Sequence, residues 1–176
     1  MKMKKYLILL ILLLITSFFY SFTIGRGKDC IHPAIKATIN GNRAFRSCDA
    51  DAHLIVSMFN IYGTSNKDII GINFMTSLNE TLPGTYVITK AGEKTKGQKF
   101  GVNFVYYLNG STIKDRYESV SGTVTFTIAD GKHFKGTFSG LAKQKESKAA
   151  VQITNGTFDL YYNPAGNVTL GKKNKK

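Results

Sequence analysis

The chain has 176 residues, 43% of them hydrophobic, and carries 24 lysines and arginines against 11 acidic residues, a net charge of +13. This length suits one ordinary domain, and no linker rich in proline or serine divides it, so we expect a single domain. The excess of positive charge favours acidic partners, namely acidic glycans or an anionic lipid surface, although scattered lysines are also explained by solubility alone.

Residues 1–25 have the order of a secretory signal peptide. Three lysines within the first five residues precede an apolar run from Tyr6 to Phe22, which ends in small residues just before Arg26. The run also approaches the ~20 residues needed to span a bilayer, so the segment is either a cleaved signal or a retained N-terminal membrane anchor. Both alternatives predict export to the periplasm, the cell envelope or the medium, and nucleic acid is therefore not expected as a partner.

The remainder, residues 26–176, is expected to form a single all-β domain that ends in a basic tail, Lys172 to Lys176. It carries 21 basic and 11 acidic residues, because three lysines and no acid lie in the first 25 positions. Its net charge is therefore +10. The tail offers nothing apolar to dock, so we expect it to be mobile from Gly171 onwards.

Cys30 and Cys48 are the two cysteines of the chain. In an oxidising compartment a disulfide between them is the natural expectation. Closing this short loop would stabilise the domain by about 3 kcal/mol. The alternative is lipid attachment at Cys30, but Lys28 and Asp29 stand where lipidation requires small residues.

The first half of the domain is typical of short strands separated by turns, because β-branched and aromatic residues are abundant and no helical periodicity appears. Turns are predicted at Asn40–Asn42, at Gly63–Lys67 and at Pro83-Gly84. Asp49–Ala52 is expected to add at most one helical turn. The predicted strands are Ala34–Ile39, Arg43–Cys48, His53–Tyr62, Asp68–Ser77 and Thr85–Thr89.

Two Asn-Gly pairs are turn signals in the second half of the domain. Asn109-Gly110 predicts a hairpin between Phe100–Leu108 and Ser111–Glu118. Asn155-Gly156 predicts another hairpin, unless it is a bulge within one long strand. In the hairpin interpretation, the flanking strands are Ala149–Thr154 and Thr157–Tyr162.

The clearest strand runs from Gly122 to Ile128, where apolar residues alternate with threonines. Asp130-Gly131 predicts a tight turn into the next strand, His133–Leu141. We expect one set of side chains to be buried and the threonines to face solvent. The buried set is Val124, Phe126 and Ile128, with Phe134 and Phe138 beside them. About ten such strands predict an all-β antiparallel sandwich or a partly closed barrel.

Four stretches of the domain carry strand and turn motifs: ATINGNRAF (Ala37 to Phe45), LPGTY (Leu82 to Tyr86), SGTVTFTIADGKHFKGTFSG (Ser121 to Gly140) and VQITNGTFDL (Val151 to Leu160). In these stretches the chain resembles a family of uncharacterised bacterial cell-envelope proteins, a domain of unknown function. The resemblance covers most of the domain and implies a small, secreted or lipid-anchored, all-β protein. It implies no activity and no functional residues. The chain departs from lipid-anchored members because Asp29 precedes Cys30.

No catalytic site, metal site or cofactor is expected. The best metal candidate is the group Asp49, Asp51 and His53, which would share one side of an extended segment, but a polar turn explains these residues as well. No G-x-S-x-G nucleophile motif is present, since Gly136 to Gly140 carries Thr-Phe-Ser within a strand.

Two adjacent tyrosine pairs are the most suggestive polar groups. Tyr106 and Tyr107 lie in one predicted strand, and Tyr161 and Tyr162 in another, so one member of each pair must face outwards. Outward rings could stack on sugars, or they could cover a sheet face or a dimer contact. The sequence therefore predicts a non-enzymatic binding or structural module. The alternatives are a calycin-like barrel that carries a small apolar ligand and a hydrolase with an unrecognised site.

Overall fold

The computed structural model describes residues 32–55, 58–76, 83–110 and 112–162. The signal or anchor segment, Cys30 and the basic tail lie outside these residues, so the expectations for them stay predictions. The described part contains ten strands, and every pairing between them is antiparallel. The all-β class predicted from the sequence is confirmed. No helix in the described ranges is long and apolar enough to cross a membrane.

The strands form a nearly closed, barrel-like sheet in the order β2-β1-β10-β9-β8-β7-β5-β4-β3, and β6 pairs with β8 beside β7. A short 3-10 turn, η2 (Ile113–Asp115), precedes β8. The strands are β1 (Ile35–Ile39), β2 (Arg43–Ser47), β3 (Asp49–Ile55), β4 (Met58–Ser65), β5 (Asp68–Phe74), β6 (Gly84–Ile88), β7 (Val102–Tyr107), β8 (Arg116–Ala129), β9 (His133–Gln144) and β10 (Ala150–Tyr161).

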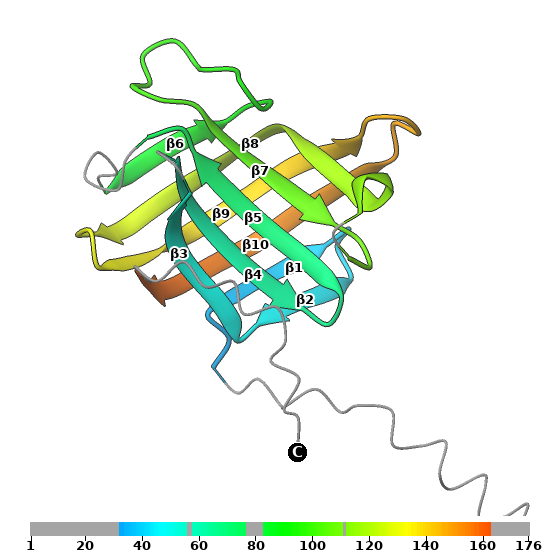
Figure 1. The fold of residues 1–176 in the computed structure, drawn as a ribbon, viewed down its shortest axis with the longest axis horizontal. Helices are drawn as coiled ribbons and strands as arrows, with labels where there is room; N and C mark the ends of the chain where they lie inside the picture. Colours follow the sequence, from blue (N-terminus) through cyan, green and yellow to red (C-terminus); the bar gives the residue numbers. More distant parts are fainter. Residues whose placement is uncertain (1–31, 56–57, 77–82, 111, 163–176) are drawn as a thin grey trace, which may run out of the picture. The chain divides into compact units, whose positions relative to one another are not determined.

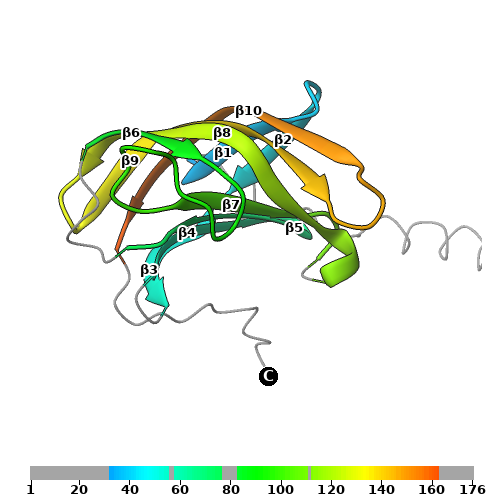
Figure 2. The same cartoon turned by 90° about the horizontal axis from the view of Figure 1, so that it is seen from above.

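The sheet folds over into two layers (Figures 1 and 2). The first layer contains β6, β8, β9, β10, β1 and β2. The second layer contains β7, β5, β4 and β3. The chain passes from the first layer to the second at Cys48, between β2 and β3.

Polar contacts join β2 in the first layer to β5 and β7 in the second. Arg43 on β2 forms an ion pair with Asp68 on β5 at 3.0 Å. The Tyr106 hydroxyl donates to the same carboxylate at 2.8 Å and accepts a hydrogen bond from Arg43. Burial and the neighbouring Asp68 carboxylate raise the pKa of Tyr106 above its usual value. At another point the end of β10 meets β3 through a single parallel bridge between Tyr162 and Ala52.

Aromatic rings occupy the space between the layers. The ring centroids of Phe59 and Phe134 are 4.5 Å apart, and Phe126 lies 5.2 Å from Phe74 and 5.1 Å from Phe158. These separations are typical of aromatic side chains in contact. All five rings are at most 2% exposed. Burial of this surface is the main stabilising contribution to the fold.

Two glycines of β9 allow the rings to approach the first layer. A Cβ atom on Gly136 would lie 2.6 Å from the Phe158 ring and 2.0 Å from the Thr125 backbone oxygen. A Cβ atom on Gly140 would lie 2.4 Å from the Phe104 ring. Alternation of large and small residues on the inner side of β9 is therefore a packing requirement.

The predicted buried set is confirmed for Val124, Phe126, Phe134 and Phe138, all at most 4% exposed. Ile128 differs, because it is only half-buried. The pairing register shifts after Phe126, so that two residues of β8 oppose one residue of β9 at this bulge. Ala129 therefore takes the inward position that the uninterrupted alternation assigned to Ile128.

Several predicted boundaries were wrong because tertiary pairing extends or divides the strands. Asp49–Ala52 is part of β3 instead of a helical turn. The predicted strand His53–Tyr62 is divided between β3 and β4. The chain after Asn109-Gly110 passes through η2 instead of turning directly into a hairpin strand. Asn155-Gly156 is a bulge within β10, the second of the two alternatives, and Asn155 adopts φ 51°.

Candidate functional site

A row of threonines crosses the outer face of the first layer. The four residues, which we call the threonine row, are Thr85, Thr125, Thr137 and Thr157. Each lies directly opposite the next in the register of β6, β8, β9 and β10. The row exists because the phenylalanines beside these threonines point inwards, and the alternation of a strand then turns the threonines outwards.

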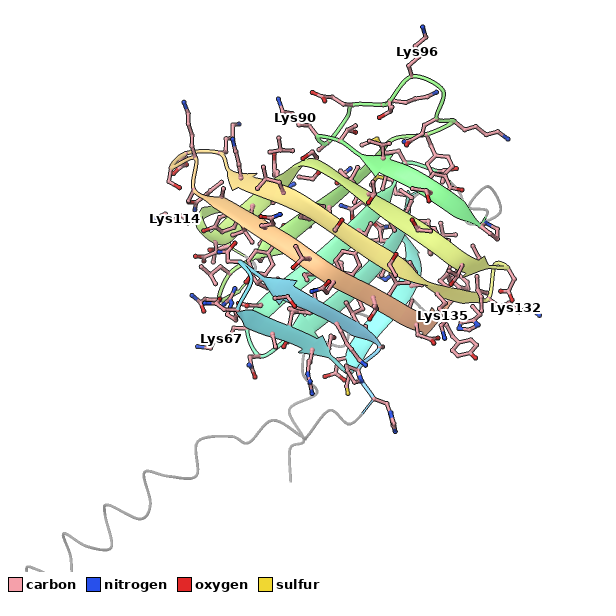
Figure 3. The ribbon with its side chains drawn as sticks, turned by 180° about the vertical axis from the view of Figure 1, so that it is seen from behind. Lys67, Lys90, Lys96, Lys114, Lys132 and Lys135 are labelled. Carbon is pink, nitrogen blue, oxygen red and sulfur yellow. The ribbon has the colours of Figure 1, made fainter. Side chains whose placement is uncertain are left out.

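Basic residues continue the row on the remaining two strands. Lys36 on β1 pairs in register with Thr157, and Arg46 on β2 pairs with Lys36. A second line of hydroxyl residues runs beside the first, with Thr123 opposite Ser139 and Thr154 opposite Thr38. We call this outer surface the threonine face. Figure 3 shows it from the front.

An open groove of about 550 Å³ crosses the threonine face. Its walls come from β8, β9, β10, β1 and the segment that leads into β1, so the groove runs across the strands. Figure 3 labels Lys135 and Lys132 at one end of the threonine face and Lys114 at the opposite end. The groove is lined by His32, Pro33, Ala34, Lys36, Thr127, Lys135, Gly136, Thr137, Thr157, Phe158 and Asp159.

The charged residues that line the groove differ in whether they have an ion-pair partner. Asp159 pairs with Lys135 at 2.8 Å and with His133 at 2.7 Å. The hydrogen bonds from Lys135 and, second, from His133 hold the pKa of the Asp159 carboxyl below its usual value, and Asp159 in turn raises the pKa of Lys135. Within the part of the chain that the structure describes, Lys36 has no carboxylate at ion-pair distance. The groove therefore offers a positive charge to an anion.

The four predicted stacking tyrosines are not brought together. Tyr161 is 69% exposed, and its ring stacks on His133 with 4.5 Å between centroids and 13° between planes. It lies on the same side of β10 as Asp159, which lines the groove. Tyr106 is fully buried, and Tyr107 and Tyr162 are half-buried. Of the four tyrosines, Tyr161 is therefore the one whose ring is largely exposed to solvent.

The outer face of the second layer carries a different row, which we call the amide row. It consists of His53, Asn60, Asn73 and Asn103, which lie opposite one another on β3, β4, β5 and β7. His53, Asn60 and Asn103 are 2%, 3% and 5% exposed. The Asn73 amide donates to the Asn103 side-chain oxygen at 2.9 Å, and Asn60 donates to the Met58 backbone oxygen at 2.8 Å.

The predicted metal candidate falls partly within the amide row. Asp51 Oδ1 lies 2.8 Å from His53 Nδ1, while Asp49 is exposed at the start of β3. His53 Nε2 is buried and forms no hydrogen bond with any described residue. Over the described ranges, no group of three or more histidine, cysteine or acidic side chains is arranged to hold a metal ion.

Cys48 lies beside the segment that enters β1, since its sulfur is 3.8 Å from the backbone oxygen of His32. Cys30 precedes His32 by two residues but lies outside the described residues. The disulfide between Cys30 and Cys48 thus stays a prediction.

The sequence identified the outward threonines of β8 and left the other members of the row unrecognised. Thr85, Thr137 and Thr157 are far apart in sequence, and each becomes informative only through strand register. The alternation around Thr137 and Thr157 was the available signal, but it does not tell which residues are opposite one another. Lys36 was missed for the same reason.

These features define an all-β domain with a nearly closed ten-stranded sheet and an open polar groove on its outer surface. A family model described as Domain of unknown function (DUF6252) matches residues 31–160, and the chain belongs to this family. The match extends from before β1 almost to the end of β10, so it includes the threonine face and the four stretches on which the resemblance was based. No curated protein and no solved structure matches the chain.

Proposed function

We propose that this protein is an exported, non-enzymatic binding module that holds an acidic glycan in the groove of its threonine face. The observation that carries the proposal is the position of Lys36, which lines the groove together with the hydroxyl residues Thr137 and Thr157. A hydroxyl both donates and accepts hydrogen bonds, as sugar hydroxyls do, and a lysine attracts the carboxylate or sulfate of an acidic sugar.

Export is supported by the apolar N-terminal segment with its leading lysines. The net charge of +10 over residues 26–176 adds a general attraction for polyanions outside the cell. These two features are independent of the groove. They define where the binding module would work and the sign of the charge it would meet.

The packed interior supports an outer binding surface over a carrier of small apolar ligands. A carrier encloses its ligand in a cavity lined by apolar side chains. Here the ring of Phe134 contacts the rings of Phe59 and Phe126 between the layers. A ligand between the layers would have to displace these rings.

The threonine face favours a glycan over an anionic lipid surface. Proteins that insert into lipid present exposed apolar side chains alongside basic ones. Three of the exposed large apolar residues, Ile55, Met58 and Met75, lie on or next to β3, β4 and β5 in the second layer. The groove presents the hydroxyl and ammonium groups of Thr137, Thr157 and Lys36 beside the partly buried Pro33 and Ala34.

The hydrolase alternative rests on the hydrogen bond between Asp51 and His53, which orients the ring as in a general base. It needs a water or a nucleophile at His53 Nε2, which is buried among the described residues. We therefore propose binding, and not hydrolysis, as the function. Incubation of the protein with polygalacturonate, followed by an assay for new reducing ends, should show no cleavage. Cleavage that His53→Gln abolishes would establish the hydrolase instead.

Calorimetric titration with polygalacturonate, which is carboxylated, and with dextran, which is neutral, tests the proposed function. We expect binding to polygalacturonate only. Lys36→Gln should weaken it about tenfold, because a hydrogen bond to a charged group contributes about 1.5 kcal/mol. Lys67→Gln is the matched control, since it removes the same charge from an exposed turn between β4 and β5 that does not line the groove.

Three results would contradict the proposal. Equal affinity for dextran would remove the role of charge. Equal losses for Lys36→Gln and Lys67→Gln would reduce the binding to the net charge of the chain. Binding to vesicles that contain phosphatidylglycerol, without binding to polygalacturonate, would assign the threonine face to a lipid surface.

A further inference from the structure

We infer that the ligand is a linear acidic polysaccharide that lies across the strands, held in the groove at Lys36, Thr157 and Thr137 and continuing beyond the groove over Thr125 and Thr85. This inference rests on the proposed function and adds the form of the ligand, its direction and its length. The direction follows from the groove, whose lining residues come from four neighbouring strands instead of from one or two.

The threonine row repeats at the spacing of the strands. Neighbouring strands in a sheet are about 4.8 Å apart, which is close to the length of one sugar residue in an extended chain. Thr85, Thr125, Thr137 and Thr157 therefore place one hydroxyl beneath each sugar. With Lys36 and Arg46, the row covers six strands and would accommodate about five or six sugars.

The hydroxyls differ in their availability along the row. Thr85 and Thr125 hydrogen-bond to each other at 2.9 Å. Thr137 and Thr157 have no side-chain hydrogen bond with any part of the chain that the structure describes. Thr137 and Thr157 also line the groove, so they are the members of the row that can bond to a sugar without losing an existing contact.

The charges give the row a polarity. Lys36 and Arg46 lie side by side at one end, whereas Thr85 and the exposed Val87 of β6 lie at the other. Among the described residues neither Lys36 nor Arg46 has an ion pair. Adjacent acidic groups of the polymer therefore fit the β1–β2 end. Farther along β10, the carboxylate of Asp159 would repel such groups. This carboxylate already forms an ion pair with Lys135.

A series of oligogalacturonates of increasing length tests the inference by calorimetry. From the disaccharide to the hexasaccharide the affinity should rise roughly 100-fold, because linked groups occupy successive subsites. It should then level off for longer chains. A neutral oligosaccharide of the same lengths should not bind. A monosaccharide or disaccharide that binds as tightly as the hexasaccharide would overturn the inference and leave the proposed function standing.

Substitutions along the row give a positional test. Thr157→Val should weaken binding of the tetrasaccharide and the hexasaccharide about threefold, because one hydrogen bond is lost. Thr85→Val should affect the hexasaccharide alone, since shorter chains held at Lys36 do not reach β6. Thr64→Val on β4, in the second layer, is the control and should change neither. Valine retains the shape and the β-propensity of threonine, so the sheet should be preserved.

Each outcome has a separate meaning. The same loss for Thr85→Val at every ligand length would overturn the direction of the ligand. If Thr157→Val and Thr137→Val together changed no affinity, the threonine row would have no role in binding. If no acidic oligosaccharide of any length bound, the proposed function itself would fail.

Discussion

The two outer faces of the sheet carry polar rows that are built in the same way and differ in exposure. Antiparallel pairing places Thr125, Thr137 and Thr157 opposite one another in the first layer, and it does the same for Asn60, Asn73 and Asn103 in the second. The threonine row is exposed or half-buried. In the amide row, Asn60 and Asn103 are at most 5% exposed and Asn73 is half-buried.

This difference shows that strand register alone does not make a binding surface. Register aligns side chains, while their exposure and existing hydrogen bonds decide what they can do. The Asn73 amide already donates to Asn103, and buried polar groups of this kind are costly to leave unpaired. The hydroxyls of Thr137 and Thr157 remain open at the groove. We therefore expect substitutions in the amide row to affect stability and those in the threonine row to affect binding.

The largest expected loss of stability comes from a substitution directly beneath the threonine face. Phe126→Ala should lower the free energy of unfolding by about 3–5 kcal/mol, because it removes a ring that packs on Phe74, Phe134 and Phe158. Thr125→Ala, next to it on the outer side of β8, should cost less than about 1 kcal/mol. Urea melts of both variants measure the difference. Equal losses would mean that the threonine face is covered as fully as the core.

The second-largest expected loss of stability is at Cys48. At this residue the chain passes from the layer with the threonine row to the layer with the amide row. If Cys30 and Cys48 form the predicted disulfide, Cys48→Ser should lower the free energy of unfolding by about 3 kcal/mol. Thiol titration of the unfolded, unreduced protein should find no free thiol. Detection of two free thiols would show that the bridge does not form.

An intermediate effect is expected in the amide row. Asn73→Ala removes the donor to the side-chain oxygen of Asn103, which is 5% exposed, so unfolding should become easier by about 1–3 kcal/mol. Thr137→Ala at the corresponding place in the threonine row should change the free energy of unfolding by less than about 1 kcal/mol. If the two losses were equal, the distinction between a structural row and a binding row would be lost.

The smallest effect concerns the acidic group in the groove. Asp159→Asn removes a negative charge near the acidic ligand and frees Lys135, so affinity for polygalacturonate should rise roughly twofold. A carboxyl with a lowered pKa stabilises the fold above its unfolded pKa of about 3.9, and this stabilisation disappears as the pH falls through the lowered folded value. The variant should therefore lose less stability than the natural chain between pH 5 and the acid limit. Weaker binding would show that Asp159 contacts the ligand as an acceptor.

The sequence predicted the fold class because alternation and turn chemistry are local. Val124 and Phe126 were assigned correctly to the interior from the alternation with threonines, and the turn at Asp130-Gly131 was placed correctly because Gly131 needs a positive φ, here 85°. Ile128 was misassigned because a bulge depends on how β8 and β9 pair, and this pairing has no local signal. The helical turn at Asp49–Ala52 was wrong for a related reason, since pairing with β4 holds this polar segment extended.

The candidate site was only partly visible in the sequence. The outward threonines of β8 and the outward direction of Tyr161 could be predicted from period-2 alternation. The alignment of Thr85, Thr137 and Thr157 with Lys36 could not, because it requires the order of five strands and their registers. The Asp51–His53 contact was foreseeable, since both side chains lie on the same side of an extended segment.

Backbone amide chemical shifts during titration with a galacturonate hexasaccharide test the central claim most directly. We predict that the changes will gather on the threonine face, at Lys36, Thr125, Thr137 and Thr157, and that the amide row will be unaffected. Changes centred on His53, Asn60 and Asn103, with none at Lys36 or Thr157, would contradict the account and move the binding surface to the second layer.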